Sequence, residues 1–218
     1  MAKCKSYKAS DQMSRLVSEN RNALLTLIRF DIALGFGDRT IEEICFDNQV
    51  DTDTFLAIIR LLSDPDCKHC QPETKISVPT LIRYLRNSHA YFLNERMPAM
   101  REKLLKVLDK REVGLNQAVT NYFDKFVAAI RKHMLYENNE VFPQLNNVNV
   151  TEKYAHVFSK QHSQIELYLT EFKNILIKYY PVQSSFSMHR FLFDICNCEQ
   201  ELIFHNAVED ELFLPAIA

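Results

Sequence analysis

The stretch His133-Met-Leu-Tyr-Glu-Asn-Asn-Glu-Val-Phe-Pro143 recurs 72 residues later as His205-Asn-Ala-Val-Glu-Asp-Glu-Leu-Phe-Leu-Pro215. In both copies a Glu follows the His by four positions and a Pro follows it by ten. On a helix, residues four apart share one face about 5–6 Å apart, so each copy can direct an imidazole and a carboxylate to one place. Two single histidines stand at matching distances, His89 44 residues before the first copy and His162 43 before the second. The pattern predicts four helices that converge on a dinuclear metal site.

The composition favours helices over sheets and over nucleotide-binding folds. Hydrophobic residues make up 47% of the 218 residues, and only three are glycine, at positions 35, 37 and 114. Because hairpin turns rely on glycine for positive φ angles, this scarcity predicts long helices with few tight turns. It also excludes the glycine-rich phosphate loops of nucleotide enzymes.

Charge and hydropathy exclude further classes of protein. The net charge of −2 offers no electrostatic surface for nucleic acid or anionic lipid. We find no apolar run long enough to span a membrane and no secretory signal pattern, and we therefore expect a cytoplasmic protein. In that compartment the six cysteines should be mostly reduced thiols.

Apolar residues repeat at intervals of three or four over four long segments, which predicts an antiparallel four-helix bundle over residues 79–218. The predicted helices span residues 79–110, 116–140, 151–179 and 185–212. Each of the four histidines lies on the apolar seam of its helix. Pro98 should kink the first helix.

The N-terminal part is predicted to be a separate small helical module over residues 1–65, followed by a polar linker over 66–78. We expect a helix over 12–34 and a chain reversal at Gly35 to Arg39. Thr40 and Glu43 have the spacing of a capping box, which begins a helix to about Asp47. A further helix should cover 52–62.

A single histidine on an apolar face is usually a hydrogen-bonded core residue, but this set is better explained as metal ligands. Two glutamates share the buried seams, no Arg or Lys falls there, and unpaired buried carboxylates are costly. His69, His156 and His189 lie off the seams. The predicted ligands are His89, His133, Glu137, His162, His205 and Glu209. Iron, manganese and zinc all suit a site of imidazole and carboxylate ligands. Glu166, four residues after His162, is either an additional ligand or a hydrogen-bond acceptor for a ligand imidazole.

With these motifs, residues 79–218 resemble the haemerythrin-like, His-His-Glu cation-binding domain. Within that family the chain is most similar to di-iron proteins that repair iron–sulfur and other iron centres after nitrosative or oxidative stress. The resemblance implies two iron ions held by the six residues above. Oxygen-carrying haemerythrins have a fifth His where this chain has Glu166, which disfavours an oxygen carrier.

The stretch from Gly37 to Cys45 is similar to the module that precedes the bundle in the repair proteins, except that Leu34 and Gly35 replace its Cys-Cys pair. Cys67 and Cys70 form a Cys-x-x-Cys in the linker. Two incidental thiols are one interpretation, and a redox or iron-transfer pair is the other.

Three functions remain open at this point. The first is repair or protection of iron–sulfur and iron centres, with damaged iron proteins as partners. The second is a di-iron oxidoreductase or sensor acting on NO, O2 or peroxide. The third is a DNA-binding regulator with a di-iron sensing domain, which the eight basic and ten acidic side chains of residues 1–65 disfavour. We expect a monomer or a homodimer, with no nucleic acid or membrane partner.

Overall fold

The computed structural model describes residues 7–63, 76–144, 151–181 and 186–217, with only the backbone of 151–159. No strand occurs within these ranges, which confirms the predicted all-α class. The α-helices are α1 (Met13–Glu19), α2 (Asn22–Arg29), α3 (Ile41–Asp47), α4 (Thr52–Ser63), α5 (Val78–Tyr91), α6 (Met97–Val107), α7 (Val113–Tyr136), α8 (Thr151–Lys178), α9 (Phe186–Val208) and α10 (Leu214–Ala216). Three π-helical turns, η1 (Phe92–Arg96), η2 (Glu137–Val141) and η4 (Glu209–Phe213), and a 3-10 turn, η3 (Phe142–Gln144), continue these helices.

Contacts between Cα atoms divide the chain into two compact units, one of residues 1–88 with 204–218 and one of residues 89–203. Both boundaries fall inside continuous helices, α5 and α9. The boundaries predicted at residues 65 and 78 were placed from the sequence pattern and differ from these. They stay predictions.

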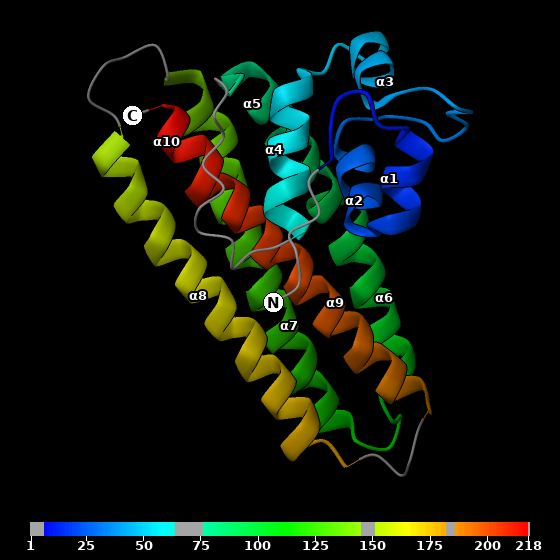
Figure 1. Ribbon diagram of the computed structural model, residues 1–218. Helices are drawn as coiled ribbons and strands as arrows, with labels where there is room; N and C mark the ends of the chain where they lie inside the picture. The colour runs from blue at the N-terminus through cyan, green and yellow to red at the C-terminus, as the bar shows by residue number, and fades with distance from the viewer. Residues whose placement is uncertain (1–6, 64–75, 145–150, 182–185, 218) are drawn as a thin grey trace, which may run out of the picture. The chain divides into compact units, whose positions relative to one another are not determined.

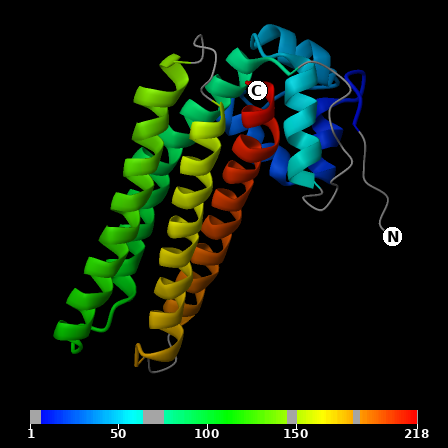
Figure 2. The ribbon, with the colours of Figure 1, turned by 90° about the vertical axis from the view of Figure 1, so that its left-hand side faces the viewer.

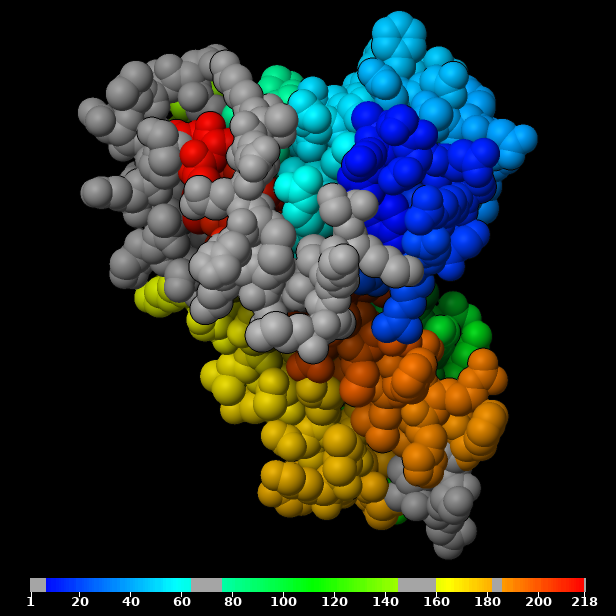
Figure 3. Space-filling view, in the orientation of Figure 1, coloured from blue at the N-terminus to red at the C-terminus, as the bar shows by residue number. Residues whose placement is uncertain are grey.

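The unit of residues 89–203 is a bundle of α6, α7, α8 and the greater part of α9, which run alongside one another in both ribbon views (Figures 1 and 2). Apolar side chains from all four helices fill its centre, among them Phe126, Phe172 and Phe191, which are at most 2% exposed. In the space-filling view, α8 and α9 (yellow and orange) form the lower surface that faces the viewer (Figure 3). The predicted four-helix arrangement is therefore present.

Polar side chains join the neighbouring helices of this bundle in a closed ring. Successive contacts link α6 to α7, α7 to α8, α8 to α9 and α9 back to α6; they are Arg101–Asp124 at 2.7 Å, Tyr122–Glu171, Lys173–Glu199 at 2.5 Å and Lys103–Asp194 at 2.7 Å. Exposed or half-buried surface pairs of this kind contribute little energy singly, so the ring specifies which helices are neighbours more than it stabilises them.

Residues 7–88 form short helices, and here one prediction was wrong. The expected helix over 12–34 is two helices, because Asn20 adopts an extended conformation with φ −136°. The Asn20 amide donates to Ser63 Oγ at 2.7 Å and its oxygen accepts from the Asn22 N–H at 3.0 Å. Asn22 donates to the Leu62 carbonyl at 2.7 Å. These bonds to the end of α4 satisfy polar groups that a continuous helix would leave to water.

Two other local predictions for this segment are confirmed. Thr40 and Glu43 form both bonds of the capping box at the start of α3. Gly35 and Gly37 have φ angles of 102° and 59°, which is the conformation that the predicted chain reversal requires.

Cys67, Cys70 and His69 lie outside the described residues. Among the residues that are described, no helix is long and apolar enough to cross a membrane.

The predicted kink at Pro98 takes the form of a π-helical turn. The run from Val78 to Val107 stays helical throughout, and η1 occupies the turn just before the proline. Since proline lacks an N–H and its ring collides with the carbonyl four residues earlier, a wider turn relieves the collision without ending the helix.

Candidate metal centre

Glu137 lies between two imidazoles that come from different helices. Its Oε2 is 3.2 Å from Nε2 of His89, on α5, and its Oε1 is 3.5 Å from Nε2 of His133, one turn earlier on α7. All three side chains are at most 2% exposed. Each oxygen of one buried carboxylate thus faces a different imidazole, which is the arrangement expected of a carboxylate that two metal ions share.

His162 extends this group from α8. Its ring centre is 4.9 Å from that of His133, and the two ring planes are nearly perpendicular at 88°. The placement follows from the apolar seam of α8, in which Ile165 and Leu169 are also buried and lie on the same face.

The second copy of the repeated motif has the same local geometry as the first. His205 Nε2 is 3.1 Å from Glu209 Oε1, and the two side chains are 2% and 0% exposed. Residues four apart on a helix lie on one face, so the sequence spacing had predicted the pairing, and the apolar seam had predicted that both side chains are buried.

The six residues make up two overlapping sets of possible ligands. One comprises His89, Glu137, His205 and Glu209, and the other comprises His133, Glu137, His162 and Glu209. Within each set, one ligand atom from every residue lies within 4.8 Å of the others, and all members are buried. Each set contains two imidazoles of its own, whereas both glutamates belong to both sets.

Side-chain amides hold two of the imidazoles. His89 Nδ1 is 3.0 Å from Asn138 Oδ1, and His133 Nδ1 is 2.8 Å from Gln161 Oε1. Because an amide oxygen can only accept, each imidazole donates from Nδ1, and its Nε2 is the ring nitrogen that faces Glu137. The ring of Phe142 stacks on His89 with a centroid distance of 5.8 Å and an interplanar angle of 10°.

Sequence reasoning missed Asn138, Gln161 and Phe142. A signal was present, since Asn138 directly follows Glu137 and Gln161 directly precedes His162. Ligating histidines usually donate their second N–H to a nearby acceptor, and that rule directs a search to such neighbours.

The donor set fits metal ions of intermediate hardness. Imidazole nitrogen with carboxylate oxygen suits iron, manganese and zinc, and neither set contains a thiolate that would favour softer ions. A pair of ionised carboxylates that are 0% exposed has a large desolvation cost, which a divalent cation offsets. The residues present therefore fit a metal site.

The other candidates lie away from these sets. Glu166 is exposed on α8 and belongs to neither set. His189 is exposed on α9, and the described residues do not include the side chain of His156. Burial raises the pKa of Cys45 and of Cys198 to about 12, so both thiols stay protonated at neutral pH.

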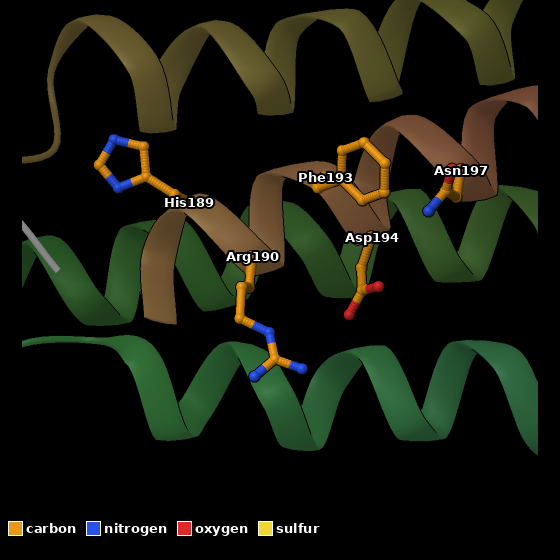
Figure 4. Close-up of a pocket in the computed structure, with 5 residues that line it drawn as sticks. All are labelled: His189, Arg190, Phe193, Asp194 and Asn197. Carbon is orange, nitrogen blue, oxygen red and sulfur yellow. The ribbon is translucent and has the colours of Figure 1, made fainter. Parts of the chain in front are cut away.

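A surface hollow of about 350 Å³ is also separate from the ligands. Its five lining residues all come from α9; they are His189, Arg190, Phe193, Asp194 and Asn197. Figure 4 shows Arg190 and Asp194 directed toward one neighbouring helix, and His189 and Phe193 directed to the other side. Asn197 is eight residues before His205, which corresponds to about 12 Å along a helix. None of the six predicted ligands lines this hollow.

Comparison with known proteins identifies the family. A search of the curated proteins finds no match. The Hemerythrin HHE cation binding domain matches residues 80–217, which covers all six predicted ligands and both π turns that begin at a glutamate. Domains of this family bind metal ions, typically iron, and the buried His and Glu sets of this chain fit that function. The chain belongs to the hemerythrin HHE cation-binding family.

Proposed function

We propose that this protein binds two iron ions that share Glu137 and Glu209. The observation that carries the proposal is the pair of distances from the two oxygens of Glu137 to Nε2 of His89 and of His133. A carboxylate that served one ion would have no reason to face imidazoles from two ligand sets. The shared membership of Glu209 supports the same conclusion.

The chain's own residues define what this site can do. Asn138 and Gln161 hold His89 and His133 through Nδ1, so the two Nε2 atoms face the site without rearrangement. Two bound iron ions would supply redox exchange and open coordination positions for small ligands. Phe142, which is 5% exposed, covers one face of His89 and keeps bulk water from that ring.

We further propose that the iron-loaded protein repairs or protects iron–sulfur and other iron centres under nitrosative or oxidative stress. Two features support this function over oxygen carriage. Glu166 is exposed where the resemblance to oxygen carriers would require a fifth histidine ligand. The stretch from Gly37 to Cys45, which resembles the module of the repair proteins, folds as a capped helix start. Damaged iron proteins would then be the acceptors, with iron as the cargo.

A second candidate is an oxidoreductase or sensor that acts on NO, O2 or peroxide. The burial of the site favours it, since all four imidazoles are at most 4% exposed and only a small molecule could reach them. The same ligands serve both functions, so turnover separates them. A DNA-binding regulator ranks third because of the acidic balance of the N-terminal residues.

The test uses the full chain loaded with iron under anaerobic conditions. Mixed with an enzyme whose iron–sulfur cluster has been damaged by NO or peroxide, it should restore that enzyme's activity and lose iron in proportion. Glu209→Ala, which removes a shared ligand, should restore little, whereas His189→Ala should match the unaltered protein. Rapid consumption of NO or peroxide with an electron donor, without any restoration, would replace repair by the oxidoreductase function.

A further inference from the structure

Three prolines stand at one position relative to the three π-helical turns. Pro98, Pro143 and Pro215 each come two residues after the end of η1, η2 or η4. The residue just before each proline donates its N–H to the carbonyl at the first position of the turn, five residues back. These bonds are Met97 to Phe92, Phe142 to Glu137 and Leu214 to Glu209. The same backbone arrangement, a π turn followed by a proline, therefore occurs three times. In two of the three, the first residue of the turn is a predicted ligand.

Packing does not account for these prolines, because all three are exposed. Each lies within or at the end of a helical run, where proline is strongly disfavoured because it removes one hydrogen bond and its ring collides with the carbonyl four residues earlier. That carbonyl belongs to Asn94, Asn139 or Glu211, in each case the central residue of the π turn. The collision is thus relieved where the turn is widest, and the prolines favour the π conformation over the α conformation.

The consequence is clearest at η2, where three side chains surround His89. Glu137 faces its Nε2, Asn138 accepts from its Nδ1, and Phe142 stacks on its ring. In an α-helix, residues five apart point about 140° away from one another, so Glu137 and Phe142 could not contact the same imidazole. The hydrogen bond from the Phe142 N–H to the Glu137 carbonyl places the two residues one turn apart on one face.

We propose that Pro143 is a positioning residue for the metal centre: it enforces the π turn that closes Glu137, Asn138 and Phe142 around His89. This rests on the metal-binding function proposed above. It also explains why a proline follows each paired His and Glu by the same interval, a regularity that the ligands alone do not require. Pro143 itself acts only through the backbone.

The experiment compares Pro143→Ala with Pro79→Ala in the full chain. Pro79 is also exposed, but it is the second residue of α5, where the missing N–H has no helical partner. The first readout is the ring tautomer of His89 in the metal-free protein, by nitrogen NMR. We expect His89 Nδ1 to be protonated and hydrogen-bonded to Asn138 in the unaltered protein and in Pro79→Ala, and a mixture of ring states in Pro143→Ala. The second readout is anaerobic iron(II) affinity, which we expect to fall about tenfold or more in Pro143→Ala and to stay within about twofold in Pro79→Ala.

A rescue variant tests the geometry itself. Deleting the exposed Asn139 in the Pro143→Ala background brings Glu137 and Phe142 four positions apart, on one face of an ordinary α-helix. The deletion should return at least part of the lost affinity, and failure to do so would count against the π turn as the cause. An unchanged His89 tautomer in Pro143→Ala would overturn the proposal. If the unaltered protein fixes the tautomer and Pro143→Ala loses it, but neither binds iron, the positioning role stands and the proposed function fails.

Discussion

The substitution Glu137→Gln removes one negative charge from the centre of the site while keeping the size of the side chain. Since the two oxygens of Glu137 face His89 and His133, the change should weaken the binding of both metal ions and not of one alone. Loss of an outer partner of a ligand typically lowers metal affinity 10–100-fold, and loss of a shared ligand should lie at the upper end of that range or beyond it.

The size of the effect on thermal stability follows from linkage. A 100-fold loss of affinity removes about 2.7 kcal/mol of metal-dependent stabilisation for each ion, or about 5 kcal/mol for two ions. For a domain of this size each kcal/mol corresponds to about 2–4 °C in Tm, so the metal-induced rise in Tm should shrink by about 10–20 °C. A ligand that served a single ion would reduce the rise by half as much.

The assay is calorimetry of each variant, without metal and with a fixed free concentration of iron(II) under anaerobic conditions. Glu166→Gln tests an exposed carboxylate close to a ligand in sequence, and Glu201→Gln tests one that is 12% exposed and pairs with Arg96 at 3.2 Å. Both should leave the metal-induced rise unchanged, although Glu201→Gln should lower Tm with and without metal. If Glu137→Gln keeps the full rise, or loses only half of it, Glu137 does not bind both ions.

Other expected outcomes concern stability, thiols and DNA. Arg96→Met removes a cation that pairs with the largely buried Glu201, and it should lower the free energy of unfolding by about 3–5 kcal/mol in urea titrations. Arg101→Met, at an exposed pair, should lower it by at most about 1 kcal/mol, and equal losses would show that burial does not set the cost. An alkylating reagent at pH 8 should modify the exposed Cys196 and spare Cys45 and Cys198, whose pKa values burial raises to about 12; peptide mass spectrometry that finds all three modified in folded protein would contradict this. The full chain should bind duplex DNA no better than a generic acidic protein, and salt-sensitive binding at submicromolar concentration would favour the regulator.

The sequence predicted the elements whose signal is local and periodic. The seams of α7 and α9 carry an apolar residue every three or four positions, so the inward direction of His133 and His205 followed from helix geometry alone. The capping box at Thr40 is equally local, because both of its bonds lie within four residues. The two lone histidines required only the same periodicity on α5 and α8.

Features that depend on tertiary contacts were not predictable in this way. Nothing in the pattern of residues 12–34 showed that Asn20 and Asn22 would bond to Ser63 and Leu62, about forty residues away. At Pro98 the sequence indicated a conflict with helix geometry, but a kink and a π turn both resolve that conflict. The recurring prolines of the two motifs were visible from the start. Their meaning required the position of His89 relative to Glu137 and Phe142.

Anomalous diffraction from crystals of the iron-loaded protein, at the iron absorption edge, would locate the two metal ions that we propose share Glu137 and Glu209. We expect two anomalous peaks of equal height in each chain, about 3.5–4 Å apart, with both glutamates next to both peaks. One peak should adjoin His89 and His205, and the other His133 and His162. A single peak, or two peaks that each adjoin only one of the glutamates, would show that Glu137 and Glu209 are not shared between two ions.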